Sequence, residues 1–467
     1  MTSLLRRPEA VISLTEAEEK NKHLGWLMLT ALGIGATIGA GIFVMPGRIA
    51  LLAGPAGFLS FAITGFVFLF VGICYERFAA VVPKGVSAYS YVYFSIGEIF
   101  AWVVAFGLFL EYSFGASAVA IGWAEYLKRV VDFHLPAFWR GSTLENGSIH
   151  FGINIVALSV VAVVTVILIF GGIQKSAKLN FFLVCLKMVL LLVFMVAGVQ
   201  HVNPANWQPF MPKGWDGVLQ GAAVAVFPYV GFDALYTFAR ESKSIKDTRV
   251  STYTCILLVA VLYVVVMAIA TGMQPVYTTV NGALVPNAIF KGTESAAPLA
   301  NLMVAAHENW AGNLIAAGAV IGIFNVLLVL SMGGPRIFRN MAEDGLLPAI
   351  FAKVKNGNPI FGLLVNGICV GSIAGFVPFE SVTDIMVLGT LVAFMFVCIG
   401  ALRMKLVHPA IALAGALGCA SLACFLTGLV WKVYCISCPV GLVFYFLYGR
   451  THSRLAKGNA ASEVVSS

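Results

Sequence analysis

Long apolar runs alternate with short polar connections along almost the whole chain. Each run holds about 20 residues, the length that a helix needs to cross the hydrocarbon core of a bilayer. The pattern therefore predicts an all-α, polytopic membrane protein. We expect about twelve transmembrane helices, at residues 26–52, 56–78, 98–127, 151–171, 178–200, 218–240, 251–273, 312–338, 359–377, 382–402, 408–428 and 430–449.

The composition agrees with this pattern. The 467 residues are 60% hydrophobic and only 11% charged, whereas soluble domains carry about 25% charged residues. Most of the nine cysteines lie inside apolar runs, and the seven histidines form no cluster. The sequence therefore predicts no metal site, and no set of nucleophile and base indicates an enzyme.

The polar segments predict the orientation. Residues 1–23 are polar and mixed in charge, without the apolar core of a signal peptide. Lys and Arg concentrate on the same side as this segment, which places both termini in the cytoplasm. We expect a tail at 1–23, one membrane domain at 24–452 and a tail at 453–467, in a multi-pass protein of the inner (plasma) membrane. The net charge of +8 then reflects orientation, and we expect no nucleic-acid partner.

Two predicted helices are interrupted at matching places. The first contains LGIGATIGAGIF (32–43), and the sixth contains AVFPYVGFDALY (225–236). Alone, the first stretch also fits a GxxxG packing face at Gly35 and Gly39, and the second fits a kink at Pro228. Irregular backbone at membrane depth is tolerated where it lines a cavity or is buried in protein. Paired weak helices in two halves indicate a transporter site built on inverted repeats.

These stretches resemble the motifs of a known family. GIGATIGAGIF and FPYVGFDA are similar to the first-helix and sixth-helix motifs of the amino acid–polyamine–organocation permeases. MAEDGLLPAIFAKV (341–354) and LGTLVAF (388–394) are similar to later segments of that family, most of all in bacterial members akin to the cationic amino acid transporters. The resemblance covers residues 24–452. It implies two inverted five-helix repeats, two further C-terminal helices, and import of amino acids by alternating access.

An amino acid zwitterion needs hydrogen-bond donors for its carboxylate and acceptors for its ammonium group, and an unwound helix offers both. We expect the N–H groups near Gly39, Ala40 and Gly41, at the start of the outer half-helix, to bind the carboxylate. Carbonyls freed at the ends of the inner half-helices, among them those of Thr37 and Val230, are expected to bind the ammonium group.

Phe227 is expected to contribute to the site twice. Its carbonyl belongs with the ammonium-binding carbonyls, and the resemblance implies that its ring covers the substrate as an occluding gate. The alternative is an ordinary core aromatic, which the position beside Pro228 makes the weaker interpretation.

Three polar residues within spans are candidates for the side-chain pocket, because polar groups at membrane depth are often functional. Glu111 of the third helix is expected to contact a cationic side chain or carry a proton, with an interhelical hydrogen bond as the alternative. Asp233 is expected to stabilise the sixth-helix break or sense protonation. Relatives with a small residue at the place of Ser331 resemble transporters of Lys, Arg and ornithine, so we expect a cationic substrate.

Lys187 lies in the middle of the fifth helix, with no acidic neighbour in the sequence. One interpretation is that its long stem reaches an interface. In proton-coupled members of the family, a lysine here occupies the place where related transporters bind sodium. The resemblance therefore implies that Lys187 bridges the first and eighth helices and couples uptake to protons. We expect protons as the coupling ion, no sodium and no other cofactor.

The chain departs from the family pattern at several places. Glu76 follows Tyr75 where an alanine is usual, Glu343 stands where an arginine is usual, and the Asn-Pro after the sixth helix is missing. Arg48, in the outer half of the first helix, has no counterpart in the pattern.

Other functions remain open at this point. The substrate could be a neutral amino acid taken up with protons, or the protein could exchange amino acids or polyamines without protons. A receptor or channel would require a soluble domain or a selectivity filter, and the sequence shows neither. The expected partners are an amino acid and the lipid bilayer, and a small membrane accessory subunit is left open.

Overall fold

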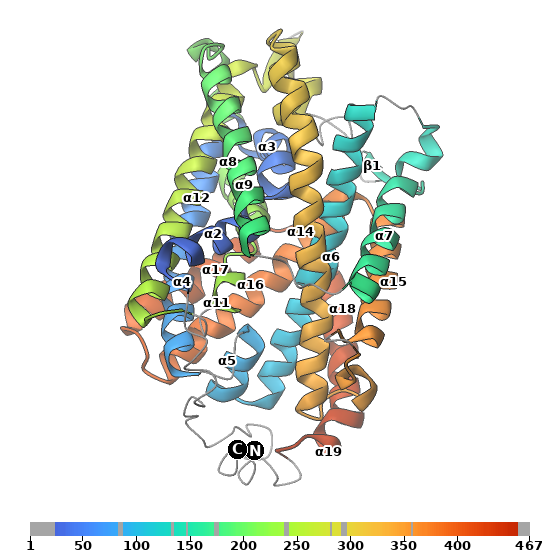
Figure 1. Cartoon of the computed structure of the whole chain (residues 1–467). Coiled ribbons are helices and arrows are strands. Elements are labelled where there is room, and N and C mark those ends of the chain that lie inside the picture. Colours follow the sequence, from blue (N-terminus) through green and yellow to red (C-terminus); the bar gives the residue numbers. More distant parts are fainter. Residues whose placement is uncertain are drawn as a thin grey trace.

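The computed structural model describes residues 24–82, 87–131, 135–145, 148–171, 177–237, 242–280, 283–290, 297–355 and 358–455. The predicted tails lie outside the described residues, apart from 453–455. The described chain is a bundle of helices, most of which run along its length (Figure 1).

Every predicted span corresponds to one helix or to a group of short helices, which confirms the polytopic all-α fold. The unbroken ones are α4 (Gly57–Val81), α6 (Glu98–Val131), α7 (Ile155–Gly171), α8 (Ala177–Val199), α12 (Ile245–Met273), α14 (Asn309–Glu343), α15 (Ile360–Phe376), α16 (Phe379–Arg403) and α17 (Pro409–Cys424). The last span consists of α18 (Gly428–Phe444), the π-helix η8 (Tyr445–Gly449) and α19 (Arg450–His452).

Two spans are interrupted, as the sequence predicts. The first consists of α2 (Trp26–Thr37) and α3 (Ala40–Ala53), and the sixth of α9 (Gly214–Val224), α10 (Val226–Tyr229) and α11 (Ala234–Thr237). Seven helices of the described chain are long and apolar enough to cross a membrane, and α2, α7, α15 and α17 are shorter apolar helices.

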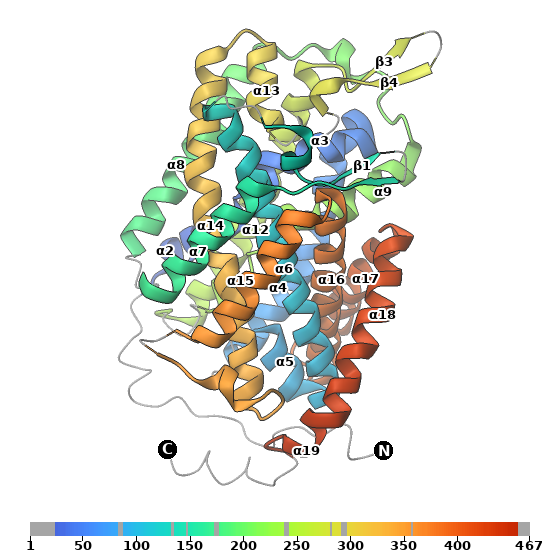
Figure 2. The ribbon, with the colours of Figure 1, turned by 90° about the vertical axis from the view of Figure 1, so that its right-hand side faces the viewer.

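The short elements lie at the two ends of the bundle. One end, which we call the hairpin end, carries the antiparallel pairs β1 (Thr143–Glu145) with β2 (Ser148–His150) and β3 (Tyr277–Val280) with β4 (Ala283–Pro286). It also carries α13, and Figure 2 shows α5 and α19 at the opposite end, which we call the α5 end. The remaining short elements are α5 (Ala88–Ser95), α13 (Pro298–Ala305), η1 (Gly54–Ala56), η2 (Ala137–Arg140), η3 (Pro204–Trp207), η5 (Ala288–Phe290) and η7 (Ala349–Ala352).

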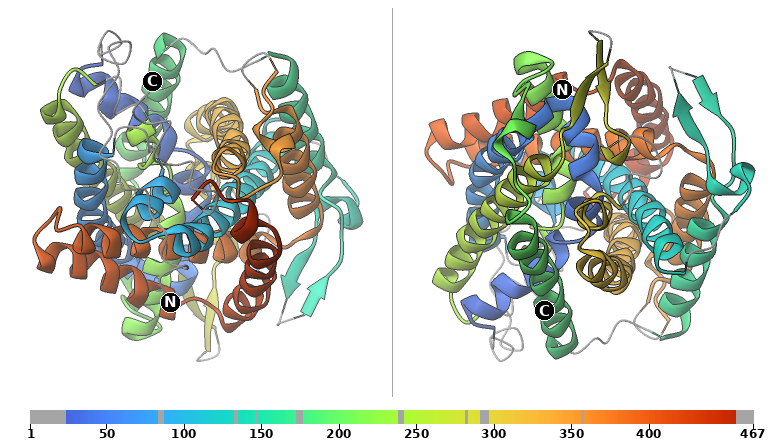
Figure 3. Two further views of the ribbon diagram at one scale, coloured as in Figure 1. Left: turned by 90° about the horizontal axis from the view of Figure 1, so that it is seen from below. Right: turned by 90° about the horizontal axis from the view of Figure 1, so that it is seen from above.

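The broken helices lie inside the bundle, and other helices surround them. Viewed along the bundle, α7, α8 and α18 lie at the rim (Figure 3). Their outward side chains are exposed, as in Phe170, Val196 and Val440, which fits a surface in contact with lipid. In contrast, α3 is buried from Ala40 to Gly47. The fold therefore shields the irregular backbone of both breaks from the surrounding medium.

Candidate functional site

The break in the first helix is two residues long. Ile38 has extended backbone (φ −75°, ψ 102°), and Gly39 (φ −155°, ψ −143°) is the N-cap of α3. No side chain caps this helix, so its first N–H groups face the break without the usual side-chain acceptor. Gly39, Ala40 and Gly41, the predicted ligands of a carboxylate, are therefore at the positive end of the α3 dipole.

The break in the sixth helix follows Pro228 rather than lying at it. Pro228 belongs to the short helix α10, Val230 is extended (φ −60°, ψ 141°) and Gly231 has a φ of +104°. Phe232 anchors this segment, because its ring lies 5.5 Å from that of Phe68 and 5.4 Å from that of Phe394. The unwound residues Val230 and Gly231 thus lie between the short helix α10 and the aromatic cluster around Phe232.

The two breaks contact each other through glycines. A Cβ atom on Gly41 would lie 2.4 Å from the Cα of Pro228, and one on Gly231 would lie 2.6 Å from the carbonyl oxygen of Ala36. Only residues without a side chain permit these approaches, and Gly231 needs glycine for its backbone conformation as well. The predicted ligand residues of both helices therefore lie next to one another.

Tyr263 of α12 joins the two breaks, and sequence reasoning missed it. Its hydroxyl lies 2.9 Å from the carbonyl oxygen of Pro228 and 3.3 Å from that of Thr37. The Phe227 carbonyl, in turn, accepts a hydrogen bond from the Val230 N–H at 3.2 Å. Because a carbonyl has two lone pairs, the Thr37 and Phe227 oxygens keep capacity for a further donor. A tyrosine in an apolar helix carries no local signal of this role.

Phe227 is buried, with 5% of its surface exposed. It lies in α10 directly beside the proline that contacts Gly41. The residue therefore lies next to the meeting point of the two breaks, and the role of its ring as a gate stays a prediction.

Glu111 and Ser331 are buried polar groups without hydrogen-bond partners in the described chain. Both carboxylate oxygens of Glu111 and the hydroxyl of Ser331 lack a hydrogen-bond partner in the described chain. The Thr390 hydroxyl faces Glu111 but donates to the Met386 carbonyl at 3.2 Å. Asp233, in the unwound part of the sixth helix, is the charged side chain whose field acts most strongly on Glu111. A buried carboxylate without a partner is costly, which is typical of a position that serves a ligand.

Lys187 of α8 bridges two other helices. Its ammonium group donates to the Gly35 carbonyl of α2 at 2.9 Å. Its stem packs on α14, because a Cβ atom on Gly322 would lie 3.2 Å from its Cγ. Only 1% of the residue is exposed, so it does not reach an interface, and no carboxylate in the described residues forms an ion pair with it. The ammonium group holds α2 one turn before the break.

Comparisons with known proteins agree with this geometry. The model of the amino acid permease family matches residues 24–454. The chain is 33% identical to a methylthioribose transporter of Bacillus subtilis over 98% of this chain and 100% of that protein. It is also 33% identical to the branched-chain amino acid permease BcaP of the same organism, over 95% of this chain and 97% of BcaP.

The chain belongs to the amino acid permease family. Among plant relatives, it is 33% identical to the chloroplastic cationic amino acid transporter 9 of Arabidopsis thaliana, over 74% of this chain and 59% of that protein. The permease is thus a multi-pass membrane transporter, and not an enzyme. Its relatives differ in the substrates that their names state.

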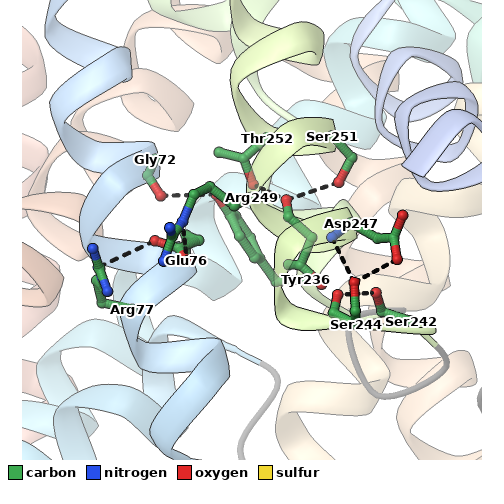
Figure 4. Close-up of polar contacts among 11 residues, drawn as sticks. Gly72, Glu76, Arg77, Tyr236, Ser242, Ser244, Asp247, Arg249, Ser251 and Thr252 are labelled. Carbon is green, nitrogen blue, oxygen red and sulfur yellow. Dashed lines mark hydrogen bonds and ion pairs between the residues drawn. The ribbon is translucent and has the colours of Figure 1, made fainter. Parts of the chain in front are cut away.

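In the permease, polar contacts hold the start of α2, the first part of the broken first helix. Asp247, in the first turn of α12, accepts a hydrogen bond from the Trp26 N–H at 3.1 Å, and Lys243 N–H donates to the Leu24 carbonyl at 2.9 Å. Figure 4 shows Asp247 held by Ser244, whose hydroxyl lies 2.6 Å from its carboxylate. The start of α2 is therefore tied to the start of α12.

Glu76, one of the departures from the family pattern, continues this contact to α4. Its buried carboxylate lies 3.1 Å from Nε of Arg249 on α12 and 3.3 Å from Nε of Arg77 (Figure 4). Another departure, Glu343, pairs with Arg339 on the same helix at 2.6 Å. The unusual residues thus form ion pairs at the α5 end.

The two ends of α14 differ in the pKa of their carboxyl groups. At the hairpin end, hydrogen bonds from His201 and Trp310 lower the pKa of Glu308. At the α5 end, burial raises the pKa of Asp344 to about 6, although the Tyr89 hydroxyl donates to it at 2.7 Å. A proton therefore binds more readily at the α5 end of this helix.

Proposed function

We propose that the permease imports amino acids with a positively charged side chain, together with protons, by alternating access. The observation that carries this proposal is the Glu111 carboxylate, which is buried, unpaired in the described chain and subject to the charge of Asp233. An ammonium or guanidinium group would give it the partner that it lacks. The names of the plant relatives support the same substrate class.

The backbone of the two breaks would bind the part that all amino acids share. The N–H groups of Gly39, Ala40 and Gly41 would hold the carboxylate, and the carbonyls of Thr37, Phe227 and Val230 would hold the α-ammonium group, in a site that several helices shield. The side chain of the substrate would then extend toward Glu111 and Ser331.

Lys187 would couple this site to protons. Its ammonium group takes the place of a cation at the Gly35 carbonyl, and its loss of a proton would weaken its hold on α2. Protons, rather than sodium, would then control the movement of the inner half-helix. We place the α5 end, where both tails begin, in the cytoplasm, and the hairpin end outside the cell.

A neutral amino acid taken up with protons is the second candidate. The branched-chain permease BcaP is similar to the chain over nearly its whole length, and a protonated Glu111 would be an uncharged wall for such a substrate.

Binding of lysine and leucine to the purified permease distinguishes the candidates. We expect lysine, arginine and ornithine to raise the melting temperature, and Glu111→Gln to weaken lysine binding by about 10- to 100-fold, because a hydrogen bond to a charged group contributes roughly 1.5–3 kcal/mol. Glu308→Gln, at the exposed hairpin end, is the control and should leave binding unchanged. Binding of leucine but not lysine, with no effect of Glu111→Gln on lysine, would instead support the neutral substrate.

A further inference from the structure

A cavity of about 370 Å³ opens beside α3 at the hairpin end. This volume falls within the range of about 300–1,000 Å³ that small-molecule sites occupy. The cavity follows α3 from Leu52 to Val44. Since Val44 lies one helical turn beyond Ala40, the cavity ends one turn away from the N–H groups that face the break.

Charged residues of both signs line this cavity. The positive side chains are those of Arg48, Arg140 and Lys213, and the negative ones are those of Glu125 and Glu380. A lining of this kind suits a solute that carries both charges. It does not select an apolar solute, nor one with a single charge.

Arg48 connects the cavity wall to α16. Its Nη2 lies 2.7 Å from Oδ1 of Asp384, and its Nη1 donates to the Thr383 hydroxyl at 2.6 Å. The side chain of Asp384 is 5% exposed, whereas that of Arg48 is 18% exposed and lines the cavity. A ligand in the cavity can therefore reach the guanidinium group before it reaches the carboxylate.

We propose that this cavity is an entry site for the amino acid zwitterion, and that Arg48 exchanges Asp384 for the substrate carboxylate as the substrate enters. The proposal rests on the proposed transport of amino acids, although not on the kind of side chain that they carry.

The chemistry of the pair supports an exchange. A guanidinium group binds carboxylates in a two-pronged manner, so the substrate carboxylate can replace that of Asp384. Removing one partner from a buried ion pair is strongly unfavourable unless another charge takes its place. The substrate ammonium group can supply that charge to Asp384. An α-amino acid brings both charges, and thus opens the contact between α3 and α16 without leaving either residue unpaired.

The test separates an exchange from a purely structural ion pair. Uptake from outside is measured in oriented proteoliposomes with whichever labelled amino acid the wild-type permease binds in detergent. In Arg48→Gln, we expect the KM for external substrate to rise at least tenfold, because the entry ligand is lost. In Asp384→Asn, we expect the KM to fall about threefold or more, because Arg48 no longer has a competing partner, while the amide oxygen that replaces the carboxylate can still accept from the substrate ammonium group. Lys432→Gln, which changes an exposed cation of α18 outside the cavity lining, is the control and should change the KM less than twofold.

A structural pair predicts another result, because both substitutions break the same contact. Equal changes of KM in the same direction for Arg48→Gln and Asp384→Asn would overturn the proposal, and so would an unchanged KM in both. Binding in detergent, where substrate can enter through either end of the bundle, should stay within threefold in each variant. If Arg48→Gln does not fold, the direction of the change in Asp384→Asn decides alone. A wild-type permease that binds no amino acid would contradict the proposed function instead.

Discussion

The two halves of the first helix are held in different ways. The outer half, α3, borders a cavity, and its charged link to the second half of the chain is the pair of Arg48 and Asp384. The inner half, α2, is tied to the start of α12 by backbone and carboxylate contacts, and Lys187 holds it near its end. In the described chain, α3 therefore borders a cavity at the hairpin end, whereas α2 is tied to its neighbours by polar contacts.

This difference determines which contacts have to break on each side during transport. On the hairpin side, one ion pair has to exchange partners before a substrate reaches the break. On the α5 side, α2 has to leave Asp247, and Arg249 of the same helix α12 is also bound to Glu76. Because several contacts must break together, release to the α5 end needs a larger trigger, and we assign that trigger to the proton on Lys187.

The largest effect is expected where the two halves meet. Gly231→Ala would place a methyl group 2.6 Å from the Ala36 carbonyl at a φ of +104°. The backbone conformation alone costs a non-glycine residue about 1–2 kcal/mol, so we expect substrate affinity to fall at least tenfold by equilibrium binding. Gly25→Ala is the control, because nothing lies within 4 Å of the added methyl group. Equal binding by both variants would show that the breaks do not form one site.

A smaller effect is expected at the α5 end, where a native thiol reports on α2. Cys255 of α12 is buried beneath Gly33 of α2, whose added Cβ would lie 2.9 Å from its sulfur. Asp247→Ala removes the acceptor of the Trp26 N–H and the partner of Ser244. A lost helix-end contact costs about 1 kcal/mol, so we expect about fivefold faster alkylation of Cys255, measured by peptide mass spectrometry.

The matched variant for this comparison is Asp384→Asn, which changes the hairpin end only. It should leave the alkylation rate of Cys255 unchanged, while Cys424, which is exposed at the end of α17 in the wild type, serves as the labelling standard. If both variants exposed Cys255 equally, the two halves of the first helix would move as one body, against the distinction drawn between them.

The sequence predicted the elements of this site better than their contacts. Hydrophobic run lengths located every span, and the glycines at 33–41 with Pro228 located both breaks, because these signals are local. The partners of the breaks were not predictable. Tyr263 sits in an apolar helix like any core tyrosine, and Arg48 meets Thr383 across 335 residues of chain. Such pairs depend on how helices pack, and a single sequence does not record packing.

The same limit applies to the departures from the family pattern. In the sequence, Glu76 has no obvious partner. The structure shows that it contacts Arg249, which lies 173 residues later in the chain. In contrast, the position of Lys187 in the middle of an apolar helix already marked it as unusual. The sequence placed it between the first and eighth helices by resemblance, and its contacts with Gly35 and Gly322 match that placement. Its role in proton coupling stays a prediction.

The most direct test of the account is therefore arginine uptake into proteoliposomes driven by an inward proton gradient. The wild-type permease should accumulate arginine only with the gradient and equally well in sodium-free buffer. Lys187→Ala should lose this accumulation, yet retain arginine counterflow, in which labelled and unlabelled substrate exchange without net proton movement. Full gradient-driven accumulation by Lys187→Ala, or a wild-type protein that accumulates arginine without a gradient, would contradict the account.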